Sequence, residues 1–185
     1  HLAWFQSRFH IVSLSSFIEL SSRGERLPKP LLALTFDDGY ENIYNHAFPL
    51  LKEFDIPATV FLTTDLVEKR MPLWVDRIEY ALGHTNLPQL ELLLDERKYS
   101  FALGNPRERV AADIYLRNFL KKIPGEELKI MLEKIESCTG IKLASVLENT
   151  PYRGLTWDKI RLMAEEKIEF APHTLSHPII SRLSS

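Results

Sequence analysis

The sequence predicts a single α/β domain, and three apolar segments carry that prediction. Leu31–Thr35 is apolar enough to be buried on both faces, as are the strands of a parallel sheet. Ala58–Leu62 is a second strand of this kind, and Tyr40–Phe54 between them has the apolar spacing of a helix. Ile168–Phe170 is a short third strand near the end of the chain. Strand, helix and strand in this order form a βαβ unit, and 185 residues suffice for one domain with a core.

Composition excludes several classes of protein. The 23 basic and 25 acidic residues give a formal net charge of −2, so neither a nucleic-acid patch nor an acidic tail is indicated. The single cysteine, Cys138, cannot form an internal disulfide, which fits a reducing compartment. No apolar run is long enough to span a membrane, and no signal peptide is visible. The chain begins at His1 rather than Met, so we expect an upstream segment to be missing, and the localisation stays open between cytoplasm and cell envelope.

The elements before the first core strand are short. Leu2, Trp4, Phe5 and Phe9 suit an amphipathic helix, Phe9–Leu14 reads as a strand, and Ser15-Ser16 is expected to cap a helix through Leu20. Within Tyr40–Phe54, Pro49 predicts a kink. Thr63–Asp65 follow the second strand and are expected to cap a helix.

The middle of the chain predicts a helix, a β-hairpin and two amphipathic helices, which are Met71–Leu82, Leu90–Leu103, Pro106–Ile123 and Gly125–Cys138. The hairpin is expected to turn at Asp95–Lys98, and Gly140 to end the last helix. We interpret residues 85–150 as an inserted region without a catalytic signature, which shapes a substrate groove or covers an edge of the fold. Thr156 then caps an expected helix, Trp157–Lys167, whose buried side is Trp157, Ile160 and Met163–Ala164.

Two adjacent carboxylates, Asp37 and Asp38, follow the first core strand. Open α/β sheets place their chemistry at the carboxyl ends of strands. Neighbouring residues on an extended segment point to opposite sides, so one can bind a metal while the other faces substrate. Gly39 permits a sharp turn directly after the pair. The alternative is that Asp37 or Asp38 caps the helix that starts near Glu41.

Two histidines near the end of the chain could bind a metal together with one aspartate of the acidic pair. His173 and His177 are four residues apart, a spacing that places both on one face of a helical turn, and Pro178 ends that turn. Two neutral imidazoles and one carboxylate form a common ligand set for a divalent metal, with positions left open for water or substrate. The sequence therefore predicts a metal site.

These motifs together resemble the polysaccharide deacetylases, the family also known as the NodB-type domain or carbohydrate esterase family 4. The resemblance rests on Thr35–Gly39, TFDDG, and His173–Pro178, HTLSHP. It continues through Ile56–Leu62 and Leu155–Asp158, and so covers most of the chain outside residues 85–150. The resemblance implies a partial, distorted (β/α) barrel.

The resemblance also implies a reaction, the removal of N-acetyl groups from an amino-sugar polymer or oligosaccharide. Asp38, His173 and His177 would hold a divalent metal, for which we expect zinc, with Co²⁺, Ni²⁺ and Mn²⁺ as the other candidates. Asp37 would be the general base. A backbone N–H near Tyr40 would stabilise the oxyanion.

Further implications concern the His loop and the substrate. Thr174 would steady the loop by hydrogen bonding. The expected partner is an N-acetylated glycan, and chitin-like oligomers, peptidoglycan, poly-N-acetylglucosamine and lipid-linked sugars all stay open. Ala171-Pro172 departs from the small residues that the family has before the first histidine. Because the sequence ends at Ser185, directly after the His motif, we expect the N-terminal part of a deacetylase domain, cut at both ends and inactive alone.

Two other classes compete with this interpretation. Magnesium-dependent phosphoryl-transfer folds such as receiver domains also carry an acidic pair after a first strand. They need a phospho-accepting Asp after another strand, for which Asp65 is a poor substitute, and they have no use for two histidines. The second competitor is a non-catalytic module of deacetylase-like fold that binds sugar or metal.

Overall fold

The computed structural model describes residues 1–24 and 28–183, which form two compact units. The first unit comprises His1–Met71 and Pro151–Ser176, and the second comprises Pro72–Thr150 and His177–Ser185. The inserted region expected at residues 85–150 falls within the second unit, which begins earlier, at Pro72. The assignment of the whole chain to one domain stays a prediction.

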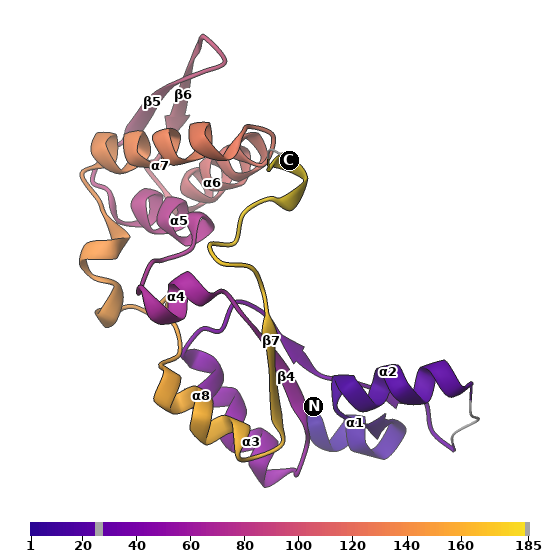
Figure 1. The fold of residues 1–185 in the computed structure, drawn as a ribbon. Helices are drawn as coiled ribbons and strands as arrows, with labels where there is room; N and C mark the ends of the chain where they lie inside the picture. The colour runs from indigo at the N-terminus through magenta and orange to yellow at the C-terminus, as the bar shows by residue number, and fades with distance from the viewer. Residues whose placement is uncertain (25–27, 184–185) are drawn as a thin grey trace. The chain divides into compact units, whose positions relative to one another are not determined.

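A three-stranded parallel sheet forms the centre of the first unit (Figure 1). Its strands are β3 (Thr35–Phe36), β4 (Ala58–Leu62) and β7 (Ile168–Pro172), in the order β3-β4-β7. The α/β class is therefore confirmed, and Ala58–Leu62 has the predicted bounds. β7 runs two residues further than predicted, because Phe61 and Leu62 continue to pair with Ala171 and Pro172.

The predicted strand Leu31–Thr35 is wrong as one element. Leu31–Leu32 forms β2, which pairs in parallel with β1 (His10–Ile11), whereas β3 pairs with β4. Backbone hydrogen bonds show the change of partner: the Val12 N–H donates to the Leu32 carbonyl at 3.0 Å, and the Thr59 N–H donates to the Leu34 carbonyl at 3.0 Å. Apolar patterning predicts an extended run but cannot predict which neighbour each residue will pair with.

In the described part of the first unit, the α-helices are α1 (Leu2–Arg8), α2 (Leu14–Arg23), α3 (Phe48–Glu53), α4 (Thr64–Glu68) and α8 (Trp157–Ala164). The N-cap of α2 lies two residues before the predicted Ser15-Ser16, because the Ser13 hydroxyl accepts a hydrogen bond from the Ser16 N–H, and the helix runs to Arg23 rather than Leu20. The predicted helix Tyr40–Phe54 is a π-helical turn, Ile43–Ala47, followed by α3. The change of helix type occurs just before Pro49, which has no N–H to donate to a preceding turn.

The cap of α8 is confirmed, but its buried face is narrower than predicted. The Thr156 hydroxyl accepts a hydrogen bond from the Lys159 N–H at 3.3 Å, and Ile160 and Met163 are buried. Trp157 is 41% exposed and Ala164 is exposed, contrary to expectation. At about 100° per residue, Trp157 and Ala164 lie on the same side of Ile160, away from Met163, and the helix is rotated toward Met163.

Helices α3 and α8 lie along one side of β4 and β7 (Figure 1). Apolar side chains of these helices and strands pack together in one cluster. This cluster includes Phe48, Leu51, Ile160 and Met163 of the helices and Ala58, Val60 and Ile168 of the strands. Full burial of a Val, Leu, Ile, Phe or Met side chain contributes about 1.5–3 kcal/mol to stability. The cluster therefore fixes the positions of β4 and β7, and with them the residues that follow the carboxyl ends of these strands.

Glu169 of β7 lies beside Thr59 of β4, and its carboxylate accepts hydrogen bonds from the Thr59 hydroxyl at 3.1 Å and the Ser15 N–H at 3.4 Å. Partial burial acts to raise the pKa of Glu169, but the hydrogen bonds from Ser13, Ser15 and Thr59 lower it below its usual value. A lowered pKa means that the folded state favours the charged carboxylate.

Glu169→Gln is accordingly expected to flatten the acid limb of the stability curve. The contribution of Glu169 is present above the pKa of the unfolded chain, near 4.5, and is lost as pH falls through the lower folded value. Because Glu169 is only partly buried, solvent screens its interactions and we expect about 1 kcal/mol or less. Urea unfolding between pH 6 and pH 3 measures this, with the exposed Glu165→Gln as control. Parallel curves for wild type and Glu169→Gln would contradict it.

The second unit contains α5 (Trp74–His84), the hairpin of β5 (Gln89–Leu94) and β6 (Arg97–Ala102), α6 (Pro106–Leu120) and α7 (Gly125–Thr139). The hairpin and the two long helices are confirmed, and Gly140, with φ 70°, ends α7 as predicted. The turn residues Asp95 and Glu96 both have positive φ, as a tight hairpin turn requires.

The first helix of the second unit begins at Trp74 rather than Met71, because a residue before a proline, here Pro72, avoids the helical conformation. The core of the second unit is formed by side chains of α5, β5, α6 and α7, against which Tyr99 and Phe101 of β6 pack. Arg77 of α5 donates two hydrogen bonds to the Glu136 carboxylate of α7, at 2.8 and 2.9 Å, which ties the two helices together. Within the described part of the chain, no helix has the length and apolar character needed to cross a membrane.

Candidate metal centre

The residues predicted to form the site lie at one edge of the three-stranded sheet. Asp37 and Asp38 follow β3, and His173 follows β7. Thr63 follows β4, the strand between them. Because all three strands are parallel, their carboxyl ends meet at the same edge, which is where α/β folds place their ligands.

The two carboxylates differ in exposure. Asp37 is exposed, whereas the Asp38 side chain is only 20% exposed. Asp38 adopts a left-handed backbone conformation, with φ 68°. Its carbonyl accepts a hydrogen bond from the Thr63 N–H at 3.1 Å, which fixes the Asp38 backbone to the end of β4. The alternative in which either aspartate caps the next helix is wrong, because the next helical segment has Asn42 at its N-cap position.

Gly39 is required by this turn. Its φ is +83°, and a Cβ added there would lie 2.6 Å from the Cδ2 atom of Leu62. The Gly39 N–H donates to the Asp37 carbonyl at 2.8 Å and closes the turn. A side chain at this position would therefore combine backbone strain with a steric clash.

Gly39→Ala is expected to lower the free energy of unfolding by about 2–5 kcal/mol, the sum of about 1–2 kcal/mol for left-handed strain and about 1–3 kcal/mol for displacement of Leu62. Gly83→Ala is the matched control, since nothing lies within 4 Å of a Cβ added at Gly83 in α5. That control should be neutral or slightly stabilising. Urea denaturation of both variants measures the difference, and equal stabilities would contradict the close approach to Leu62.

The histidine loop is not the helical turn that the spacing predicted. Residues 173–179 have no helical turn, and Thr174 and His177 both adopt left-handed backbone conformations, with φ 68° and 54°. His173 is still held like a strand residue, since its N–H donates to the Leu62 carbonyl at 2.8 Å. His177 precedes Pro178, and a residue before proline avoids the right-handed helical region.

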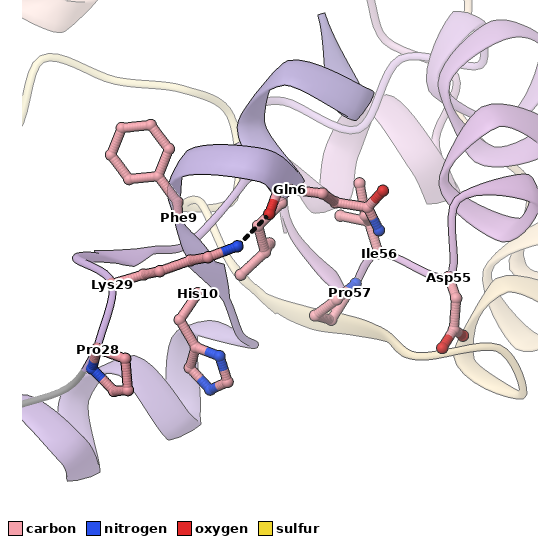
Figure 2. Close-up of a pocket in the computed structure, with 9 residues that line it drawn as sticks. Gln6, Phe9, His10, Pro28, Lys29, Asp55, Ile56 and Pro57 are labelled. Atoms are coloured by element: carbon pink, nitrogen blue, oxygen red, sulfur yellow. Dashed lines mark hydrogen bonds between the residues drawn. The ribbon is translucent and has the colours of Figure 1, made fainter.

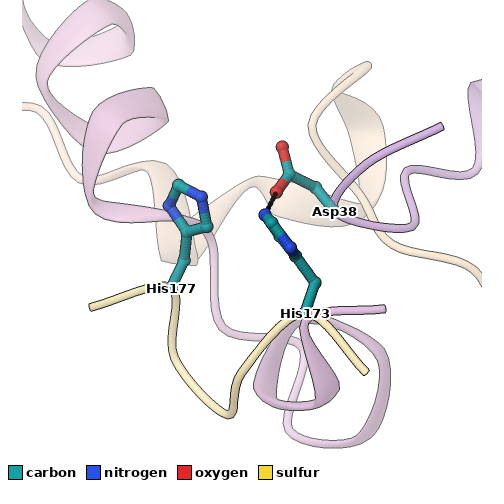
Figure 3. A group of neighbouring side chains, drawn as sticks. All are labelled: Asp38, His173 and His177. Carbon is teal, nitrogen blue, oxygen red and sulfur yellow. Dashed lines mark ion pairs between the residues drawn. The ribbon is translucent and has the colours of Figure 1, made fainter. Parts of the chain in front are cut away.

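The three predicted ligands nevertheless come together (Figure 3). The Nε2 atom of His173 lies 3.6 Å from an Oδ atom of Asp38. One ligand atom of each of Asp38, His173 and His177 lies within 4.8 Å of the other two. Chain connectivity ties His177 to the same loop, because it directly follows Ser176 of the first unit.

This donor set suits zinc chemically. Two imidazoles and one carboxylate are the ligands of open, catalytic zinc sites. Ligand atoms bonded at about 2.0–2.2 Å in a tetrahedral site lie about 3.4 Å apart, so small side-chain rotations would bring the three atoms to a common ion.

Residues at the start of α4 hold the histidine loop, a role that the sequence did not predict. Thr63 occupies the N-cap position of α4, but its hydroxyl donates to the His173 carbonyl at 3.2 Å. The Thr64 N–H donates to the Thr174 carbonyl at 3.3 Å, and the Asp65 N–H donates to the Leu175 carbonyl at 2.8 Å. One hydroxyl and two free N–H groups at the start of the helix thus fix three consecutive loop residues.

Tyr40 lies in a second contact that the sequence did not predict. It forms an antiparallel bridge with Gly154, flanked by hydrogen bonds from Glu41 N–H to Arg153 carbonyl at 2.9 Å and from Leu155 N–H to Gly39 carbonyl at 2.8 Å. A Cβ at Gly154 would lie 2.9 Å from a backbone oxygen of Leu66, so only glycine fits there. The oxyanion role of the N–H near Tyr40 stays a prediction.

A separate cavity of about 460 Å³ lies at the opposite edge of the strands in the first unit (Figure 2). It adjoins the start of β1 at His10 and the residue before β4, Pro57. Lys29 reaches across it and donates to the Gln6 carbonyl at 3.0 Å. It is lined by Gln6, Phe9, His10, Ile11, Pro28, Lys29, Asp55, Ile56 and Pro57, none of which belongs to the predicted site.

Comparison with known sequences supports the family resemblance. Residues 24–105 match the profile of the family described as Polysaccharide deacetylase. The chain is 43% identical over 82 residues to a poly-β-1,6-N-acetyl-D-glucosamine N-deacetylase of Staphylococcus epidermidis, a match that covers 44% of this chain and 23% of that protein. It is 39% identical over 57 residues to the enzyme of that name in Escherichia coli, which covers 30% of this chain and 8% of that protein. The chain thus matches less than a quarter of the length of either relative.

Comparison with solved structures supports the fold. Over 99% of its length, the chain superposes on 46% of a Streptococcus pyogenes deacetylase, PplD, solved in complex with acetate. The TM-score is 0.51 and the sequence identity 17%. The arrangement of strands and helices is therefore that of part of this deacetylase.

Proposed function

We propose that this chain carries the metal site of a hydrolase that removes N-acetyl groups from an amino-sugar polymer or oligosaccharide, because residues 24–105 match the profile of the polysaccharide deacetylase family. The observation that carries the proposal is the convergence of Asp38, His173 and His177 at the carboxyl edge of the sheet. The surrounding fold, in this proposal, is a partial, distorted (β/α) barrel.

The three ligands would hold one divalent cation, for which zinc is our first candidate and Co²⁺, Ni²⁺ and Mn²⁺ are the others. When bound, such an ion polarises the acetamide carbonyl and lowers the pKa of a coordinated water. Two protein nitrogens and one carboxylate leave coordination positions open for that water and the substrate. Asp38 and His173 already face each other, which limits the rearrangement that binding requires.

Asp37 is the general base in this proposal. It directly precedes the ligand Asp38 and is exposed, whereas the Asp38 side chain is only 20% exposed, so the Asp37 carboxylate can face substrate without being a ligand itself. Asp37 takes a proton from water, and the resulting hydroxide adds to the acetamide carbon. The carbon–nitrogen bond then breaks, and protonation of the nitrogen gives acetate and a free amino sugar. A backbone N–H near Tyr40 stabilises the intermediate oxyanion, and Thr174 holds the histidine loop, where its carbonyl bonds the Thr64 N–H.

The relatives narrow the choice of substrate. Both sequence relatives described above carry the name poly-β-1,6-N-acetyl-D-glucosamine N-deacetylase, so we propose this β-1,6-linked polymer as the substrate to test first. Chitin oligomers, which are β-1,4-linked, carry the same acetamide on a different backbone and so separate recognition of the linkage from the chemistry.

Acetate release tests the proposal. The 185-residue chain and the full gene product are each incubated with poly-β-1,6-N-acetylglucosamine, with zinc and after removal of metal by a chelator. The full gene product is expected to release acetate only with metal. Release that persists after complete metal removal would contradict metal dependence. Binding of the polymer without acetate release would instead indicate the non-catalytic binding module.

A further inference from the structure

A buried carboxylate, Glu41, lies three residues after the proposed ligand Asp38. The Glu41 residue is only 5% exposed. Its carboxylate pairs with two cations of one segment, Arg153 and Lys159, and its own N–H donates to the Arg153 carbonyl at 2.9 Å. All of these residues belong to the first unit.

Two cations compensate for the burial of the Glu41 charge. A buried carboxylate loses its hydration, and only close, well-oriented cations compensate for that loss. The Nζ atom of Lys159 also lies 5.0 Å from the centre of the Tyr44 ring, so its position is fixed by two contacts. Removing the charge of Glu41 would leave Arg153 and Lys159 without their common partner.

The ion pairs reinforce a backbone connection between two loops. The Leu155 N–H donates to the Gly39 carbonyl at 2.8 Å, so residues 153–155 run alongside residues 39–41. Arg70 holds the outer side of that segment, with its Nη1 atom 2.7 Å from the Gly154 carbonyl. On its other side, the acidic loop is bonded through the Asp38 carbonyl to Thr63. The loop with both aspartates is thus held between the end of β4 and residues 153–155.

We propose that Glu41 is a positioning residue for this loop. It pairs with Arg153 and Lys159 and thereby keeps Asp38 in the conformation in which it faces His173. Glu41 touches neither metal nor substrate and acts only through the backbone of residues 39–41. The inference rests on the proposed function, because positioning Asp38 matters only where Asp38 is a ligand.

Cobalt titration tests the proposal, with Co²⁺ alone as the probe and its visible absorption as the readout. Glu41→Gln keeps the size of the side chain and removes its charge. We expect Co²⁺ affinity to fall about 10- to 100-fold, as for other residues that orient a metal ligand, and the absorption bands of bound Co²⁺ to shift. Asp158→Asn is the control for charge, since Asp158 pairs with Arg161 at the surface. Ile56→Val is the control for lost stability, since Ile56 is buried in the same core.

Amide hydrogen exchange of the metal-free protein provides an independent readout. Glu41→Gln should speed exchange of the Leu155 and Thr63 amides at least about 10-fold, with the Ile56→Val variant as reference. Wild-type Co²⁺ affinity in Glu41→Gln would overturn the positioning role. If wild type bound no Co²⁺, the proposed metal site would fail. The exchange rate of the Leu155 amide would still test whether Glu41 holds the loop. An unchanged rate in Glu41→Gln would overturn the inference.

Discussion

Asp37→Asn is expected to abolish deacetylation while leaving the metal bound. The substitution removes a proton acceptor and conserves the size of the side chain, and a positioned general base is commonly worth about 10²- to 10⁴-fold in rate. Asp38→Asn, one residue later, should reduce metal occupancy as well, because a neutral amide oxygen is a weaker ligand than a carboxylate. The two variants can be compared directly, since both make the same substitution in the same turn. The two side chains differ in exposure, as expected for a base and a ligand.

Two measurements on the same samples separate the aspartates. Acetate release gives turnover, and metal content after dialysis gives occupancy. Loss of turnover with full occupancy is expected for Asp37→Asn, and loss of both for Asp38→Asn. The two roles would have to be exchanged if Asp37→Asn emptied the site and Asp38→Asn did not.

His173→Ala and His177→Ala are each expected to weaken zinc binding by at least about 100-fold. Even residues that only orient a ligand cost about 10- to 100-fold when removed, so loss of a ligand should cost more. Binding should also weaken as pH falls, because protons compete with the metal for imidazole nitrogens and carboxylate. Isothermal titration with zinc measures both effects.

His46→Ala and His84→Ala are the controls for this experiment. Both histidines are exposed, and neither belongs to the ligand cluster. They should leave the high-affinity site unchanged. Equal zinc affinity in wild type, His173→Ala and His177→Ala would contradict the assignment of the ligands.

Local patterns were sufficient to predict the central strand β4, the hairpin and several helix ends. Ala58–Leu62 is buried on both faces, and a short, continuous apolar run is typical of a strand in the middle of a parallel sheet. The hairpin around Asp95 and the helix ends at Pro106 and Gly140 follow from turn and cap chemistry that lies within a few residues. The placement of Asp38 and His173 at one edge follows from the parallel order of their strands.

Contacts between distant segments could not be predicted from such patterns. The division of Leu31–Thr35 into two strands depends on which neighbour each residue pairs with, which no local pattern specifies. The helical turn expected at the histidines does not form, because Pro178 disfavours the right-handed helical conformation at His177, an effect that follows from the sequence itself. The partners of Glu41 lie more than a hundred residues away, and a lone glutamate after an acidic pair gives no sign of burial.

Anomalous X-ray scattering at the zinc edge, from crystals of the zinc-loaded chain, tests the central claim most directly. The account predicts one strong zinc peak at the carboxyl edge of β3 and β7, bonded to a carboxylate oxygen of Asp38 and to a ring nitrogen of each of His173 and His177. A zinc peak bonded to other residues, or none at these three under conditions where zinc is bound in solution, would contradict it.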